Sequence, residues 1–328
     1  MKKWLSRVAP ALIASAMMTA SGVALASEEF PSKSVRFVVP FSAGGGGDVL
    51  CRVVAQEMSK ILGKQVYVEN IPGASGQIGT RAVARASPDG HTIMFGSIGP
   101  MTVGPHFFDL PYDTLNDFQA VGRLSSAVGL IVVKADSPAR TLEEFVALAK
   151  ADPAYRTYGT SSHGGPNHLA GEMFQRAAGI ELQHAPYKGD SGAMTDVMAG
   201  VLPVMFTTLG SVLTQINGGN LRALATFGDV RSRFLPDVPT LKELGYKDMQ
   251  YSAWFGVYVP SGTPEERVQK LSGALKASLE SPGVQEAVLA IGNDPEPSTA
   301  AELDAWTKHE YQRWGEVIRT SGIKIDGP

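Results

Sequence analysis

Short apolar runs rich in β-branched residues alternate with segments of helical periodicity, and this alternation constrains the fold more than any other feature of the chain. A first series leads from the run "VRFVVP" to the run "HTIMFG", and a second occupies residues 141–227. Strands joined through helices pair in parallel, because each crossover returns the chain to the same end of the sheet. The pattern therefore predicts an α/β protein with a mostly parallel sheet in each of two lobes.

Two extended apolar runs, "LIVVKADSP" and "YSAWFGVYVPSGTP", lie at the edges of the second series. Each ends in a proline-punctuated loop, which suits a strand that crosses from one lobe to the other. Two such crossovers form a hinge beside a cleft, and small-molecule sites favour clefts between domains. We expect one domain of residues 27–131 with 250–328 and a second domain of residues 132–249.

Residues 1–26 have the pattern of a secretory signal peptide. The start "MKKW" and Arg7 are positive, a stretch of apolar and small residues follows, and Ala24 and Ala26 form an A-x-A site before Ser27. We therefore expect export, with cleavage near Ala26. A single cysteine leaves no internal disulfide for the exported protein.

The composition excludes several classes of protein. Hydrophobic residues make up 44% of the chain and charged residues 19%, which is typical of a soluble globular protein. The net charge is -3, and no basic cluster occurs beyond the signal. The sequence therefore gives no indication of a nucleic-acid partner.

The stretch "VVPFSAGGGGD" breaks from an apolar strand into four glycines before a helix. Glycines in a row indicate that a ligand approaches the main chain closely, although a purely structural turn is the alternative. Val49 stands where a dinucleotide-binding loop needs a small residue, and no G-K-[ST] follows for a Walker loop. The remaining prediction is an anion, such as a carboxylate, bound by free N–H groups at a helix N-terminus.

The second series repeats this arrangement in "YGTSSHGGPNH", which also runs from a strand through hydroxyls and glycines into a helix. The two stretches fall in different lobes. We therefore expect two anion-binding loops that close on one acid from both sides.

A secreted hydrolase is the alternative from a different class. Residues 189–192 spell G-D-S-G, so Ser191 would be the nucleophile with His163 or His184 as base. That motif belongs to a β-barrel, whereas here it opens a helix between parallel strands, and no G-x-S-x-G elbow occurs. The histidines show no H-E-x-x-H spacing, so we expect no metal, no cofactor and no catalytic residue.

Nine motifs, in order, give the chain a resemblance to the extracytoplasmic receptors of tripartite tricarboxylate transporters, the Bordetella-type uptake proteins. They are "VVPFSAGGGGD", "VENIPGASGQIG", "PDGHT", "LPYDTLNDF", "NHLAGEMF", "APYKG", "LRALA", "LPDVPT" and "WFGVYVPSGTP". The resemblance implies a two-lobed periplasmic binding protein, similar to type II, that closes on a small carboxylate. It further implies delivery of that ligand to integral membrane transporter subunits, and we expect a monomer in the periplasm.

One departure from the family pattern concerns the ligand. Where many of these receptors read "MFDNLP", this chain reads "MFTTLG", so Thr207 replaces an aspartate that would repel a second carboxylate. We therefore predict a dicarboxylate ligand, aliphatic or aromatic, rather than an amino acid. The expected ligand contacts are Phe41, Ser42, Ala43, Gly44, Gly45, Ser97, Ser161, Ser162, His163, Tyr187, Phe206, Thr207 and Thr208.

Overall fold

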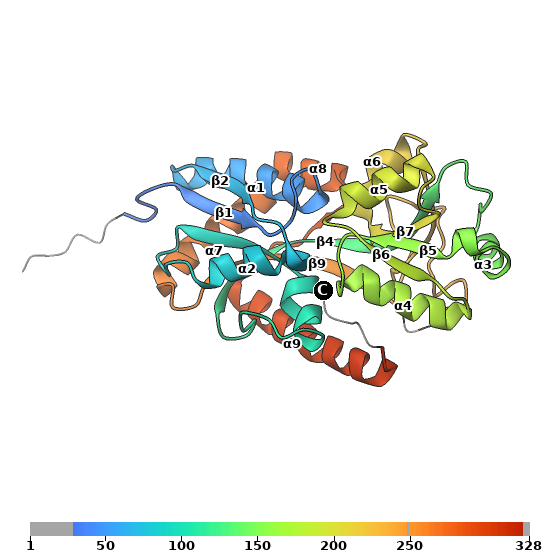
Figure 1. Ribbon diagram of the computed structural model, residues 1–328. Coiled ribbons are helices and arrows are strands. Elements are labelled where there is room, and N and C mark those ends of the chain that lie inside the picture. The colour runs from blue at the N-terminus through green and yellow to red at the C-terminus, as the bar shows by residue number, and fades with distance from the viewer. Residues whose placement is uncertain (1–28, 248, 324–328) are drawn as a thin grey trace, which may run out of the picture.

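The computed structural model describes residues 29–247 and 249–323, so the expected signal peptide lies outside the described residues. The chain forms two lobes that lie side by side (Figure 1). Strands of both lobes belong to one continuous set of paired strands. In the first lobe the strands are, in spatial order, β2 (Val66–Asn70), β1 (Val35–Val39), β3 (Thr92–Ser97), β9 (Ser252–Pro260) and β4 (Phe118–Lys134). The second lobe contains β7 (Val204–Thr208), β5 (Thr157–Thr160), β6 (Gln183–Pro186) and β8 (Leu221–Thr226).

Parallel pairing occurs within each lobe, as the strand and helix alternation predicts. Strand β1 pairs in parallel with β2 and β3, and β5 pairs in parallel with β6 and β7. The antiparallel pairs involve the two extended strands: β9 lies between β3 and β4, and β4 also pairs with β7 and β8. The short strand β10 (Asp294–Pro295) adds to β4.

Strand β4 physically joins the lobes (Figure 1). It pairs with β9 from Phe118 to Val128 and with β7 and β8 from Gly129 onward. The strand therefore changes sheet near Gly129, in the region where the sequence predicts a crossover. We retain the division into residues 27–131 with 250–328 and residues 132–249 as a proposal.

Helices cover both faces of each sheet. Because side chains alternate along a strand, Phe37 of β1 packs toward one set of helices and Val38 toward the other. Likewise Met205 and Phe206 of β7 belong to the clusters on opposite faces of the second sheet. The first lobe carries α1 (Gly46–Leu62), α7 (Glu265–Glu280) and α8 (Pro282–Ala290) on one face, with α2 (Gln77–Ala84) and α9 (Ala300–Ser321) on the other. The second carries α5 (Asp190–Ala199) and α6 (Leu209–Asn217) on one face, with α3 (Leu142–Ala151) and α4 (Pro166–Ala178) on the other.

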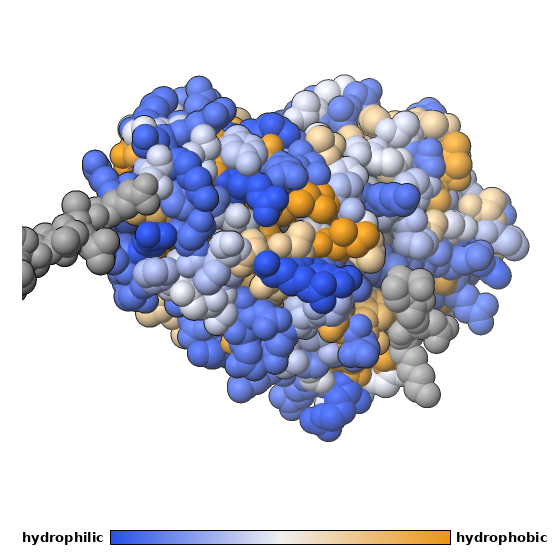
Figure 2. All heavy atoms as spheres, turned by 60° about the vertical axis from the view of Figure 1, so that its left-hand side comes forward, coloured by the Kyte–Doolittle hydropathy of each residue, from blue (hydrophilic) through white to orange (hydrophobic). Residues whose placement is uncertain are grey.

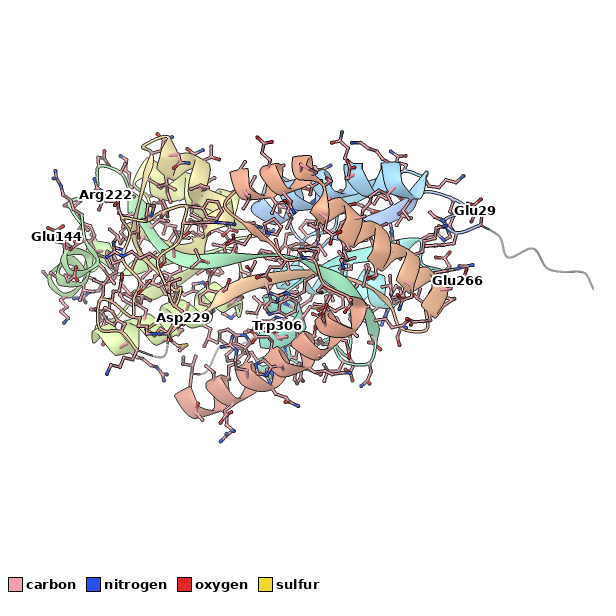
Figure 3. All side chains as sticks on the ribbon, turned by 180° about the vertical axis from the view of Figure 1, so that it is seen from behind. Glu29, Glu144, Arg222, Asp229, Glu266 and Trp306 are labelled. Carbon is pink, nitrogen blue, oxygen red and sulfur yellow. The ribbon has the colours of Figure 1, made fainter. Side chains whose placement is uncertain are left out.

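The face shown in Figure 2 is mainly hydrophilic, with hydrophobic residues gathered near its middle. Glu144 and Glu266 project outward from the far ends of the two lobes (Figure 3). Among the described residues, no helix has both the length and the apolar character needed to cross a membrane.

Candidate functional site

A cavity lies between the two lobes and has a volume of about 1040 Å³, its open mouth included. The first lobe contributes residues 45–48 and the rings of Phe41, Phe95 and Phe255. The second lobe contributes residues 161–167 and the starts of α5 and α6. Residues from both lobes therefore form the walls, as the predicted hinge and cleft require.

Four helices begin at this cavity. The N-cap residues of α1, α4, α5 and α6 all line it, and none of the four helices has a side-chain hydrogen bond at its cap. These N-caps are Gly45, Gly165, Gly189 and Thr208. A helix start presents unbonded N–H groups and the positive end of the helix dipole, so this convergence favours an anion.

Two of these starts have the same backbone arrangement. Gly44 and Gly164 immediately precede the N-caps of α1 and α4, and both adopt left-handed φ angles, +83° and +66°. In each helix the third residue reaches back: Asp48 Oδ2 accepts from Gly44 N–H, and His168 Nδ1 accepts from Gly164 N–H, both at 3.0 Å. We call residues 41–48 the first glycine loop and residues 161–168 the second glycine loop.

The charge of Asp48 is balanced within the first lobe. Asp48 is 4% exposed, and Arg52 Nη2 lies 2.9 Å from Asp48 Oδ1. Burial raises the pKa of Asp48, but hydrogen bonds from Arg52, Gly44 and Asn70 outweigh burial and hold it below the usual range. The carboxylate is therefore ionised and paired beneath the first glycine loop.

A second carboxylate, that of Asp190, lines the cavity from the start of α5. Its Oδ1 accepts from Thr207 Oγ1 and its Oδ2 from Ser211 Oγ, each at 2.8 Å. No described cation forms an ion pair with Asp190. Burial raises the pKa of Asp190 above its usual range, and the two hydroxyl hydrogen bonds offset only part of that shift. Two acids thus line one cavity, but only Asp48 has a counter-charge.

Comparison with known proteins assigns the chain to a family. Residues 50–323 match the model of the tripartite tricarboxylate transporter family receptor. The chain belongs to this family. The predicted family is therefore confirmed, and it consists of solute-binding receptors, which are not enzymes.

Two curated relatives show how far the similarity extends. The receptor is 38% identical over 303 residues to the UPF0065 protein of the TAR-I ttuE-ttuC' intergenic region of Agrobacterium vitis, covering 92% of this chain and 88% of that one. It is 34% identical over 303 residues to Protein BugT of Bordetella pertussis, covering 92% and 93% of the two chains.

Solved structures confirm the predicted two-lobed periplasmic-binding-protein fold. The periplasmic binding protein BugD superposes with a TM-score of 0.86 at 33% identity, over 90% of this chain and 99% of that one. MatC from Rhodopseudomonas palustris, with bound malate, superposes with a TM-score of 0.83 at 28% identity, over 88% of this chain and 100% of that one. R. palustris Rpa4515 with adipate superposes with a TM-score of 0.86 at 29% identity, over 90% of this chain and 99% of that one.

Eight of the predicted contacts line the cavity of the receptor. They are Phe41, Ser42, Gly45, Ser97, Ser161, Ser162, His163 and Thr208. Ala43 and Gly44 lie in the first glycine loop but do not line the cavity. Tyr187 lies beside it in a smaller hollow, and its hydroxyl donates to the Asp196 carboxylate.

Phe206 and Thr207 occupy different places from those expected. Phe206 is fully buried and packs edge-on against Tyr158 in the second lobe, away from the cavity. Thr207 is also fully buried, and its hydroxyl donates to Asp190. Thr207 carries no charge, but the Asp190 carboxylate lies beside it, so this wall of the cavity is not free of negative charge.

Several lining residues were not predicted from the sequence. Asn167 and Asp190 fall in the first turns of α4 and α5, next to the glycine N-caps, so the helix-start pattern itself was a usable signal. Phe108 and Asn293 lie far along the chain from every predicted loop. No local pattern in the sequence marks those two positions.

Three histidines lie close together at the second glycine loop, and two of them, His163 and His168, belong to it. His168 and His184 stack with ring centroids 3.6 Å apart and planes 15° from parallel, and His163 lies 5.0 Å from His168 by the same measure. One nitrogen from each ring lies within 4.8 Å of the others, so these are the described residues best placed to hold a metal. A metal must lie in the plane of each ligating ring, however, and two parallel stacked rings cannot both aim at one ion.

The histidine hydrogen bonds favour neutral rings. His184 Nε2 lies 2.7 Å from Thr160 Oγ1, whose own hydrogen goes to Ser162 O, so His184 donates at Nε2. Burial lowers the pKa of His168 to about 3 and that of His184 to about 4, with neighbouring histidines adding to both shifts. His184 is thus engaged with Thr160 and His168, which does not favour the alternative of a hydrolase with Ser191.

Proposed function

We propose that this receptor captures a small dicarboxylate by closing its lobes and delivers it to the integral membrane subunits of a tripartite tricarboxylate-type transporter. The observation that carries the proposal is the convergence of four helix starts without side-chain caps on one cavity. Each start attracts negative charge, and Asp190 already supplies a carboxylate at the starts of α5 and α6, so the starts of α1 and α4 face the ligand. Two of the similar structures contain malate or adipate, and both of those ligands are dicarboxylates.

The two glycine loops are the proposed carboxylate sites. Main-chain N–H groups at the start of α1 would bind one carboxylate. The second glycine loop, with Ser161 and Ser162, would bind the other. The rings of Phe41, Phe95 and Phe255 line the space between the loops and suit an aliphatic or aromatic spacer.

Contacts between the lobes support capture by closure. Ser42 Oγ donates to Lys188 O at 3.0 Å, and Ser75 Oγ donates to His163 O at 2.8 Å. Both bonds join a loop of the first lobe to a loop of the second, next to the cavity. Relative motion of the lobes about β4 and β9 would break them, so they favour the closed arrangement.

The compartment and assembly state belong to the same proposal. The family is one of periplasmic binding proteins, and we propose that the chain reaches the periplasm through cleavage near Ala26. We further propose that it acts as a monomer, without cofactor, metal or nucleic acid.

A ligand screen tests the proposed function. Mono-, di- and tricarboxylates are added to the purified mature protein, melting temperatures are measured, and the hits are titrated by calorimetry. Dicarboxylates are expected to raise the melting temperature most, because a ligand that binds the folded state stabilises it by mass action. Incubation with esters and amides is the control for the hydrolase alternative. Turnover of those substrates, or no stabilisation by any dicarboxylate at millimolar concentration, would overturn the proposal.

A further inference from the structure

The two carboxylates that line the cavity are held in opposite ways. Asp48 is paired with Arg52 and turned toward the first glycine loop, where Gly44 and Asn70 also donate to it. Asp190 has hydroxyl donors only, Thr207 from the end of β7 and Ser211 from the first turn of α6. A cavity wall for an anionic ligand therefore contains a carboxylate with no cation of its own.

The hydrogen bonds to Asp190 leave part of its accepting capacity unused. An ionised carboxylate has about four acceptor positions on its two oxygens, and it donates nothing. Thr207 and Ser211 each occupy one position and fix the carboxylate in orientation. No other described hydrogen bond reaches the Asp190 carboxylate, and Asp190 lines the cavity. A ligand group placed there gains a charge-assisted hydrogen bond only if it is a donor.

Two helix starts surround the Asp190 carboxylate. The carboxylate lies at the start of α5 and beside the start of α6, and both helix dipoles favour its ionised form. It therefore takes up the anion-attracting capacity of these two starts. The starts of α1 and α4 remain for ligand carboxylates, on opposite walls of the cavity.

We infer that Asp190 is a specificity-determining residue that accepts a hydrogen bond from a hydroxyl or ammonium substituent on the ligand. The receptor then prefers hydroxy- or amino-substituted dicarboxylates to unsubstituted ones of the same length. This inference rests on the proposed function, because it assumes that the glycine loops bind the carboxylates. It also means that a third ligand carboxylate directed at Asp190 would be repelled.

Calorimetry with ligands of matched length tests the inference. Succinate, malate and aspartate share a four-carbon dicarboxylate frame and differ by no donor, one hydroxyl or one ammonium. Malate or aspartate is expected to bind the native protein at least tenfold more tightly than succinate. In Asp190→Asn, which keeps the shape but loses the charge, that ratio is expected to fall below threefold. Asp196→Asn, a substitution in the same helix at a residue that does not line the cavity, is the matched control and should leave the ratio unchanged.

The comparison within the native protein decides the outcome even if Asp190→Asn does not fold. Succinate that binds as tightly as malate and aspartate would overturn the role of Asp190 while supporting the proposed function. An unchanged ratio in a folded Asp190→Asn variant would do the same. If none of the three ligands, nor any other dicarboxylate, binds, the proposed function fails and the inference fails with it.

Discussion

The first and second glycine loops share a backbone and differ in charge. Each has a left-handed glycine, an extended glycine N-cap and a third helical residue that accepts from the left-handed glycine. In the first loop that residue is Asp48, whose charge Arg52 balances. In the second it is His168, which is neutral because burial lowers its pKa to about 3.

The difference between Asp48 and His168 shows which features a glycine loop requires at the third helical residue. The shared part, the left-handed glycine and the acceptor that bonds it, places an uncapped helix start at the cavity. The acceptor itself need not be charged, since an imidazole nitrogen replaces a carboxylate oxygen at the same 3.0 Å. Elsewhere in the receptor, α3 and α9 begin with capping boxes in which Thr141 and Thr299 bond the helix start. The helices of the two glycine loops, α1 and α4, have no side-chain hydrogen bond at their caps, which leaves their first N–H groups for a ligand.

The largest expected effect concerns the two left-handed glycines. Both substitutions, Gly44→Ala and Gly164→Ala, place a side chain at positive φ, which costs about 1 to 2 kcal/mol. At Gly44 the added methyl group meets nothing within 4 Å, whereas at Gly164 it would lie 2.3 Å from the Phe108 ring. Gly164→Ala should therefore lower the free energy of unfolding by about 2 to 4 kcal/mol, and Gly44→Ala by about 1. Urea denaturation measures both, and equal losses would contradict the steric argument.

A smaller effect concerns ligand affinity at the first loop. A side chain added at Gly46 would approach Gly210 O of the other lobe to 3.1 Å, so Gly46→Val should hinder closure. We expect dicarboxylate affinity to fall at least tenfold, about 1.4 kcal/mol, with little loss of stability. Gly273→Val is the control, because Gly273 lies in α7 with nothing within 4 Å. If calorimetry finds the same dicarboxylate affinity in both variants, the first glycine loop does not take part in lobe closure.

The smallest effect, taken per pH unit, separates the loops by their response to pH. In the unfolded chain His168 is protonated below about pH 6.5, whereas in the folded protein its pKa is lowered to about 3. The stability that the neutral ring contributes is therefore complete above pH 6.5 and decreases as the pH falls. His168→Asn keeps an acceptor for Gly164 N–H and cannot titrate. Between pH 6 and 4, the native protein should lose about 1 kcal/mol more per pH unit than this variant.

Urea denaturation at several pH values measures this difference, with His184, His163 and Glu172 left in place beside residue 168. Parallel pH dependences of the two proteins would show that His168 is not the titrating group. Asp48 provides the contrast, since its lowered pKa confines its own loss of stability to pH values below about 4.

The sequence predicted those features that depend on neighbouring residues. The alternating runs predicted the parallel strands, and the glycine stretches predicted both anion-binding loops, because glycine-rich helix starts are local patterns. The orientation of Phe206 and Thr207 was not readable, since residues 204–207 of β7 are all buried and polarity does not alternate along the strand. The charge at the site was missed for a different reason. Asp190 meets Thr207 and Ser211 only because the start of α5, the end of β7 and the start of α6 lie at one point in space.

The histidine cluster shows the same limit. His163 and His168 are close in sequence, but His184 joins them because β6 pairs beside β5. Pairing partners are set by the whole sheet, and a single sequence gives no register between separate strands. The predicted absence of a metal motif rested on spacing along the chain, which cannot detect this kind of meeting.

The position of β9 between β3 and β4 governs the order in which the receptor can be assembled as it is synthesised. Residues 94–97 of β3 pair with residues 255–258 of β9, about half the chain apart. Until residues 252–260 have been made, the central strands of the first lobe have no partner between them, whereas the second lobe is already complete in sequence. Native pairing over such separations slows folding. The chain should therefore remain without a finished first lobe until its last quarter is synthesised, and residues 27–131 alone should not fold.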